Sequence, residues 1–184
     1  MKKVLFAVGS LRKASFNRQL AEIASSMISD RVEAVFLDYQ DVPFMNQDIE
    51  FPVPDAVERV REEVRNADAI WFFAPEYNYS YPGVLKNLLD WLSRPQVPGG
   101  RKDESAIAGK AVTVSSAAGR SAGAGTRSNL NMLFKSIHAK AIDLDETGVS
   151  LSKESFETGK LILSDNEKDC LKAQAEALLG FLGA

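Results

Sequence analysis

Hydrophobic and polar residues follow two patterns, which alternate along the chain. Short apolar runs, about four to eight residues long, are typical of strands that are buried on both faces of a sheet. Longer segments with apolar residues three and four positions apart are typical of amphipathic helices. The apolar runs predict strands over residues 4–8, 32–37, 69–74, 111–115 and 139–144. The amphipathic segments predict helices that begin at Phe16, after Pro54, near Pro82, at Ser128 and after Ser164.

This regular alternation of strands and helices predicts an α/β fold with a parallel sheet. Five predicted strands and five predicted helices favour a three-layer sandwich with helices on both faces and the flavodoxin-like strand order 2-1-3-4-5. A chain of 184 residues without internal repeats or a low-complexity linker is expected to form one domain, residues 1–184. In such a sheet, ligands bind beyond the carboxyl ends of the strands, here at the switch point between the first and third.

The loop between the first predicted strand and helix has the composition of an anion site. Its polar side chains are those of Ser10, Arg12, Lys13, Ser15 and Asn17. Backbone N–H groups at a helix N-terminus bind phosphate readily, and a guanidinium adds a forked charged contact. Alternatively, Ser15 only caps the helix and the two cations are solvated. The loop has neither a Walker A nor a Gly-x-Gly-x-x-Gly motif, which favours a terminal phosphate monoester over a nucleoside triphosphate or a dinucleotide.

A second loop, over residues 75–83, follows the third predicted strand. It holds three tyrosines in five residues and ends in Pro82-Gly83 at a helix start. These side chains offer flat surfaces on which a heteroaromatic ring could stack, while Asn78 and loop amides meet its polar edge. Alternatively, the tyrosines pack in a subunit interface, where this residue type is common.

Composition excludes several other classes of function. The net charge of −3 gives no general basic surface for nucleic acid. The single cysteine, Cys170, permits no internal disulfide, fits a reducing compartment, and is interpreted as a packed residue of the last helix. One histidine, His138, and one cysteine disfavour a transition-metal site. The sequence shows no signal peptide and no apolar run that could span a membrane, so we expect a cytoplasmic protein without membrane insertion.

Residues 9–17 and 75–91, taken together and in this order, resemble the NADPH-dependent FMN reductase family. This flavodoxin-like family includes quinone, azo-dye and chromate-type reductases, and the resemblance covers nearly the whole chain, most weakly over 139–163. It implies that the FMN phosphate is held by Ser10, Arg12, Ser15, the backbone of Phe16, and Asn17. It implies that the isoalloxazine ring is lined by Pro75, Glu76, Tyr77 and Asn78, with Ser116 completing the pocket. Two residues depart from the family pattern: Ala14 replaces a frequent glycine, and Tyr81 replaces a smaller aliphatic residue.

The resemblance also implies a reaction. FMN would take a hydride at N5 from NADPH or NADH and then reduce a quinone, a flavin, an azo compound or a metal oxyanion in a ping-pong scheme, without a dedicated catalytic acid–base pair. A homodimer or homotetramer is expected from the family and from the aromatic residues Tyr79, Tyr81 and Trp91. Two alternatives remain: a flavodoxin-type electron carrier, and a non-catalytic flavin-binding regulatory protein on the same fold.

Overall fold

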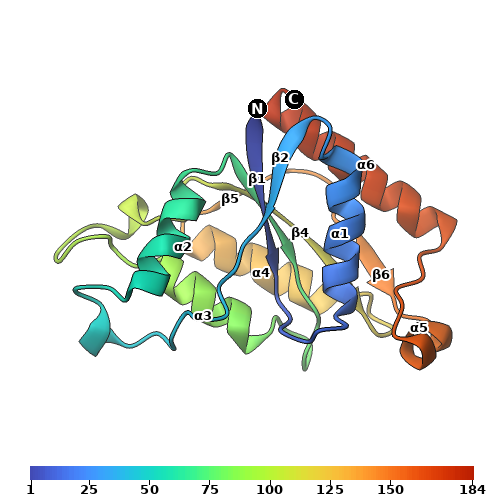
Figure 1. Cartoon of the computed structure of the whole chain (residues 1–184), viewed down its shortest axis with the longest axis horizontal. Helices are drawn as coiled ribbons and strands as arrows, with labels where there is room; N and C mark the ends of the chain where they lie inside the picture. The colour runs from blue at the N-terminus through green and yellow to red at the C-terminus, as the bar shows by residue number, and fades with distance from the viewer.

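A parallel sheet lies at the centre of the protein, with helices on both of its faces (Figure 1). A computed structural model describes all residues, 1–184. The strands are β1 (Lys2–Val8), β2 (Val32–Phe36), β3 (Ala69–Phe73), β4 (Ala111–Ala118), β5 (Lys140–Ala141) and β6 (Gly148–Ser150). The helices are α1 (Phe16–Ile28), α2 (Asp55–Arg65), α3 (Gly83–Leu92), α4 (Ala124–Ser136), α5 (Lys153–Thr158) and α6 (Asp165–Leu182), with short 3₁₀ turns η1 (Gln47–Ile49) and η2 (Lys102–Glu104). The strand order β2-β1-β3-β4-β5 confirms the predicted flavodoxin-like topology.

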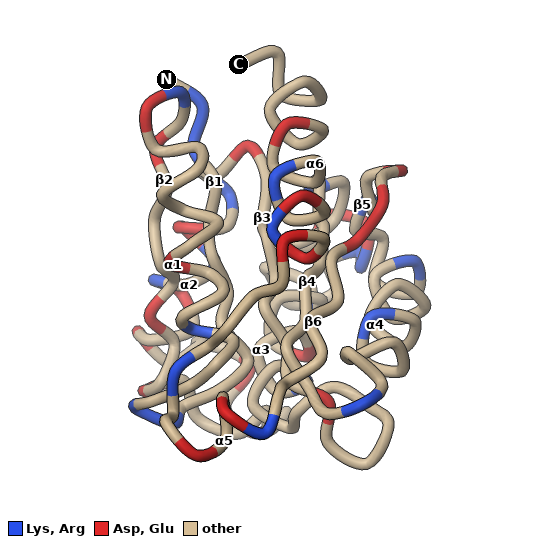
Figure 2. Tube along the Cα trace, turned by 90° about the vertical axis from the view of Figure 1, so that its right-hand side faces the viewer, with Lys and Arg blue, Asp and Glu red and all other residues tan.

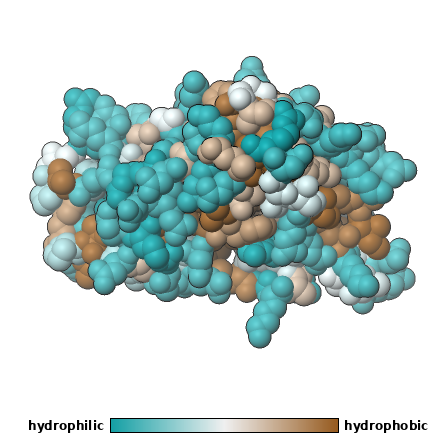
Figure 3. Space-filling view, turned by 45° about the horizontal axis from the view of Figure 1, so that its top comes forward, coloured by the Kyte–Doolittle hydropathy of each residue, from teal (hydrophilic) through white to brown (hydrophobic).

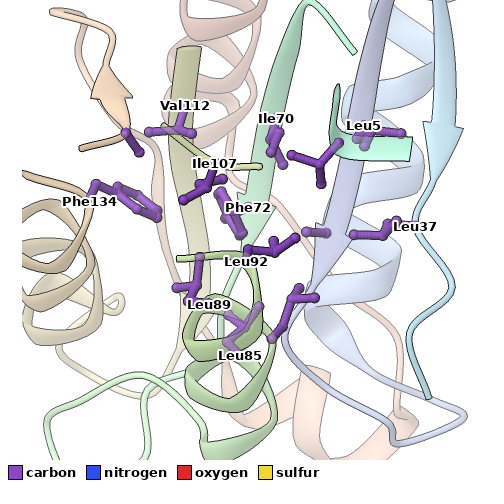
Figure 4. Close-up of a cluster of buried hydrophobic side chains, with 14 of the residues drawn as sticks. Leu5, Leu37, Ile70, Phe72, Leu85, Leu89, Leu92, Ile107, Val112 and Phe134 are labelled. Atoms are coloured by element: carbon purple, nitrogen blue, oxygen red, sulfur yellow. The ribbon is translucent and has the colours of Figure 1, made fainter. Parts of the chain in front are cut away.

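The apolar strands are buried on both faces, as their composition predicts. In β3, Ile70 and Phe72 point into one cluster of buried side chains, between the sheet and α2, α3 and α4 (Figure 4). Trp71 and Phe73 alternate with them and point into a second cluster, which the sheet forms with α1 and α6. This period of two is the geometry of a strand, and it explains why no polar residue interrupts β3.

The fifth position of the sheet differs from the prediction of one strand over residues 139–144. The two residues of β5 pair with the start of β4, whereas β6 pairs with its end, through Ser116 and Gly148 as one of the partner pairs. Between them the chain leaves the sheet, and Glu146 lies 4.0 Å from the guanidinium of Arg127. The Glu146 carboxylate also accepts hydrogen bonds from Asn131 Nδ2 of α4 at 3.0 Å, so the segment between the two strands is attached to α4.

Two predicted helix boundaries also change. Helix α4 begins at Ala124 rather than Ser128, because Gly123 adopts a left-handed conformation (φ 74°) that lets the chain enter the helix early. Helix α5 was not predicted at all. Helix α6 begins with the predicted capping box, in which the side chains of Ser164 and Glu167 bond to each other's backbone N–H.

Two side chains lie differently from their prediction. Cys170 is exposed on α6, so its interpretation as a packed residue is wrong. Trp91 is buried, at 1% exposure, and its Nε1 donates a hydrogen bond to the Pro43 carbonyl at 2.8 Å. Trp91 therefore belongs to the core and cannot contribute to a subunit interface.

The charged residues of both signs are distributed along the chain, and one face of the surface can be seen in detail (Figure 2 and Figure 3). Acidic and basic residues are interspersed along the whole trace (Figure 2). The end of the molecule that carries both termini is mostly hydrophilic with separate hydrophobic areas (Figure 3). No helix is both long and apolar enough to cross a membrane. The carboxyl ends of β1, β3 and β4 lie at the opposite end, where the two loops predicted to form the site and helix α5 gather (Figure 1).

Candidate active site

A cleft of about 260 Å³ lies at the carboxyl ends of β1, β3 and β4. It is lined by Ser10, Arg12, Ser15, Phe16, Asn17, Pro75, Glu76, Tyr77, Ala117, Ala118, Gly119, Leu151 and Phe156. The structure thus brings together most of the residues that the sequence predicted, from two loops that are distant in the chain. The two exceptions are Asn78 and Ser116, which do not line the cleft.

The N-terminus of α1 forms one end of the cleft. Ser15 caps the helix, because its side chain accepts a hydrogen bond from the Arg18 N–H at 3.2 Å. The N–H groups of Phe16 and Asn17 have no acceptor within the protein, and the first turn contains no acidic residue. Free N–H groups and the positive end of a helix dipole attract an anion. Capping by Ser15 and anion binding are therefore compatible, since they use different N–H groups.

Arg12 adds a free positive charge at this end. Its guanidinium carbon lies 5.4 Å from the centre of the Phe16 ring, a cation–π distance that positions the group beside the start of α1. Neither Arg12 nor Lys13 takes part in any ion pair of the protein. Ala14, the departure from the family pattern, does not have a positive φ, so the turn forms without the glycine that relatives often carry.

Asn17 has a different environment from the one expected of a phosphate ligand. Its Nδ2 donates to the Ala117 carbonyl at 2.8 Å, and its Oδ1 accepts from the Ala117 N–H at 2.9 Å. The side chain is buried, and its amide is engaged on both sides. Asn17 therefore fixes the start of α1 to the end of β4, which joins the anion end of the cleft to its opposite wall.

Gly9 allows the first loop to pass close to α3. Its N–H donates to the Phe73 carbonyl at 2.8 Å, and a Cβ at this position would lie 2.5 Å from Leu85 Cδ1 and 3.1 Å from Pro82 Cγ. Leu85 is fully buried, and its Cγ would also lie only 2.9 Å from the added Cβ. We expect Gly9→Ala to lower the free energy of unfolding by about 1–3 kcal/mol, as overpacking does. Urea denaturation measures this change.

Gly83 provides the matched control for Gly9. It is the first residue of α3, and an added Cβ there meets no atom within 4 Å. Alanine is also the better helix former, so Gly83→Ala is expected to leave stability unchanged or slightly higher. Equal destabilisation by both substitutions would contradict the close approach at Gly9.

A tight turn forms the other end of the cleft. Tyr77 and Ser80 exchange two backbone hydrogen bonds, of 2.9 and 3.0 Å, around Asn78 and Tyr79. Both central residues have positive φ, 51° and 63°, the combination that defines a type I′ turn. Asparagine tolerates this conformation, but a tyrosine in it is a true outlier. The turn points Asn78 and Tyr79 into solvent, and only Tyr77 reaches the cleft.

Helix α4 holds this turn in place. The Glu76 carboxylate accepts hydrogen bonds from Ser121 Oγ at 2.6 Å and from the Thr126 N–H at 3.0 Å. Asn129 Nδ2 donates to the Tyr79 carbonyl at 3.0 Å. Burial alone would raise the pKa of Glu76, but these hydrogen bonds and the nearby Arg127 charge lower it below its ordinary value. Glu76 thus stays ionised at neutral pH and serves as a cap for α4 rather than as a general acid.

The lowered pKa of Glu76 predicts a pH dependence of stability. A carboxylate with a depressed pKa stabilises the folded state above its ordinary pKa, about 4.3, and this contribution is lost as pH falls through the lower folded value. Glu76→Gln removes the group that titrates. We therefore expect the difference in stability between wild type and E76Q to shrink as pH falls from 5 to about 3, as measured by urea denaturation at each pH. A difference that stays constant with pH would contradict the ionised cap.

Five lining residues of the cleft are not among the predicted site residues: Ala117, Ala118 and Gly119 at the end of β4, and Leu151 and Phe156. Leu151 and Phe156 come from a part of the chain outside all of the predicted site loops. They lie just before and within α5, whose start is capped by Ser152 and whose end is formed by Gly159 with φ 69°. A serine cap followed by a glycine stop was the available signal, but a helix this short has no periodicity to support it. Ser116, by contrast, lies behind the cleft wall: it is fully buried, and its Oγ donates to the Ala74 carbonyl at 2.5 Å.

Fold and cleft together define a flavodoxin-like α/β protein with an anion site and an adjoining aromatic turn at its switch point. The chain belongs to the NADPH-dependent FMN reductase family, whose model matches residues 1–154. This finding confirms the resemblance carried by the two loops and makes the protein an oxidoreductase of an FMN- and NAD(P)H-dependent family.

Similar proteins agree with this assignment. An NAD(P)H-dependent FMN reductase of Pseudomonas aeruginosa is 33% identical over 178 residues, which cover 96% of this chain and 92% of that protein. A quinone reductase of Escherichia coli strain K12 is 35% identical over 167 residues, 87% of this chain and 85% of its own. Among solved structures, the flavoenzyme NAD(P)H:(acceptor) oxidoreductase FerB of Paracoccus denitrificans superposes with a TM-score of 0.84 at 27% identity, covering 100% of this chain and 98% of its own.

Proposed function

We propose that the protein is an FMN-dependent NAD(P)H oxidoreductase that reduces a quinone or a similar small acceptor. The observation that carries this proposal is the anion end of the cleft, where the free N–H groups of Phe16 and Asn17 lie beside the unpaired guanidinium of Arg12. Neutral hydroxyls and one forked cation suit a terminal phosphate monoester, the group that ends the FMN side chain. The donor set therefore fits FMN.

The remaining cleft residues would position the flat part of the cofactor. Pro75, Glu76 and Tyr77 line the cleft on one side, and Ala117 to Gly119 line it on the other. Hydride acceptance from the nicotinamide and electron delivery to the acceptor are chemistry that the isoalloxazine ring supplies when FMN is bound. Pro75 to Tyr77 and Ala117 to Gly119 would hold that ring at the ends of β3 and β4, where its position would determine the rate of such a transfer.

We expect a ping-pong scheme, because donor and acceptor would react with FMN in the same cleft and could not stack on one flavin face together. We expect steady-state rates with NADPH and 1,4-benzoquinone, each varied at several fixed levels of the other, to give parallel double-reciprocal lines. Intersecting lines would contradict a shared stacking position. A protein that binds FMN but oxidises no NADPH would instead be an electron carrier.

We propose further that the protein works as a homo-oligomer, a homodimer or a homotetramer, of one-domain subunits. Two aromatic side chains, Phe44 and Tyr79, are 85% and 81% exposed on loops that hydrogen bonds hold in place. Large exposed aromatics on ordered loops are typical of interfaces. Sedimentation at micromolar concentration tests this proposal: a single species of 20.1 kDa would contradict it.

The lone free thiol, on Cys170, supports a reducing, cytoplasmic location.

A further inference from the structure

A second cavity, of about 590 Å³, adjoins the cleft. It is lined by Gly119, Arg120, Leu151, Lys153, Phe156 and Glu157. Gly119, Leu151 and Phe156 line both spaces, so the two are continuous at the end of β4, on the side where the flat ring would lie. Most of this cavity is formed by α5 and the residues next to it, and Phe156 and Glu157 lie beyond the part of the chain that the family model matches.

Phe156 is an exposed aromatic on a fixed backbone. Its side chain is 61% exposed, and its ring meets Phe16 edge-on at 5.8 Å between ring centres. The chain after it is held to α1, because Gln19 Nε2 donates to the Gly159 carbonyl at 3.0 Å and Gln19 Oε1 accepts from the Leu161 N–H at 2.8 Å. Core packing does not explain a phenylalanine that is held in this way with most of its ring in solvent.

The cavity is lined by two cationic side chains, Arg120 and Lys153, and one acidic side chain, Glu157. Arg120 is exposed and forms no ion pair, whereas Lys153 is 90% exposed and forms a long ion pair, 3.5 Å, with Glu157. An aromatic face beside one unpaired cation and one exposed, loosely paired cation suits a purine ring that carries phosphate groups. We propose that this cavity binds the adenosine phosphate half of the nicotinamide donor, with Phe156 against the adenine and Arg120 and Lys153 on the phosphates. This inference rests on the proposed function.

Another cavity, beside the anion end, is a weaker candidate. It shares Ser10 and Arg12 with the cleft and includes Arg18. The Arg18 guanidinium is paired with Glu22 at 3.0 Å and covers the Phe36 ring at 3.9 Å, so neither the charge nor the aromatic face is free. A donor must also bring its nicotinamide to the flat ring, which the cavity next to Gly119 borders.

Calorimetric titration of the FMN-loaded protein with adenosine 2′,5′-bisphosphate and with AMP tests the proposal. We expect the double variant R120Q/K153Q to bind the bisphosphate about tenfold more weakly, with a smaller loss for AMP, because it loses charged contacts to phosphate. Phe156→Ala is expected to weaken both ligands alike. Lys160→Gln is the matched control, since it removes an exposed cation from the same segment outside the cavity.

The inference would be overturned if the wild-type protein did not bind the bisphosphate. It would also be overturned if R120Q/K153Q and F156A both bound the bisphosphate within twofold of wild type, or if K160Q lost as much affinity as R120Q/K153Q. In steady-state kinetics, we expect R120Q/K153Q to have a higher KM for NADPH than wild type, with kcat unchanged. Failure of the proposed function looks different, because NADPH would then leave the flavin of the wild-type protein oxidised. If NADPH reduces wild type and the variants alike with equal KM, only the adenosine site is refuted.

Discussion

Replacing Arg12 with methionine is expected to raise the dissociation constant of FMN about 10- to 100-fold, because a hydrogen bond to a charged group contributes about 1.5–3 kcal/mol. The guanidinium lies against the Phe16 ring at the start of α1 and has no carboxylate partner, so its charge is available to the ligand. Quenching of flavin fluorescence on binding measures the constant. Riboflavin, which lacks the phosphate, is expected to bind R12M and wild type equally well.

This pair of ligands separates a phosphate contact from general damage to the cleft. Arg18→Met provides a second control, because Arg18 lies in the first turn of α1 and is paired with Glu22. It is expected to change the affinity for FMN by less than R12M does. If R12M weakens FMN and riboflavin to the same extent, Arg12 shapes the cleft but does not hold the phosphate.

Gln174→Leu is expected to lower the free energy of unfolding by about 3–5 kcal/mol, the largest loss of stability that we predict. Gln174 lies on the buried face of α6, and its side chain makes four hydrogen bonds. Its Oε1 accepts from Ser115 Oγ and from the Thr147 N–H, both at 2.8 Å. Leucine leaves these buried donors without an acceptor, and each such group costs about 1–3 kcal/mol. Urea denaturation measures the loss.

The network around Gln174 also explains how the far side of the site is built. It joins α6 to β4 and to the residue that precedes β6, and Trp71 Nε1 extends it by donating to Ser115 Oγ at 2.9 Å. Lys172→Leu, on the exposed face of the same helix, is the matched control and is expected to change stability by less than about 0.5 kcal/mol. A loss below 1 kcal/mol in Q174L would mean that water replaces the amide.

Local sequence patterns predicted those parts of the fold that local interactions determine. The wholly apolar run of β3 and the capping box at Ser164 identify their elements without reference to the rest of the chain. The loop at residues 9–17 was likewise readable, because a strand, a polar turn and a helix start lie in one stretch. Their order then predicted the sheet topology and the position of the cleft.

Features that depend on contacts between distant residues could not be predicted in this way. The sequence gives no sign that the side-chain amide of Asn17 also bonds to Ala117, a hundred residues away. The first turn of α4, which begins at the left-handed Gly123, is capped by the Glu76 carboxylate from another loop. Side chains of α4 and α6 contact the segment between β5 and β6, and Gln19 of α1 binds the chain that follows Phe156.

The central claim is that FMN binds in this cleft and passes electrons from a nicotinamide to a small acceptor. The visible spectrum of the purified, FMN-loaded protein, recorded without air, tests it most directly. We expect a flavin spectrum that bleaches when NADPH is added and returns when a quinone follows. A flavin that stays oxidised in excess NADPH would contradict the reductase, and a protein that takes up no FMN would contradict the cofactor site itself.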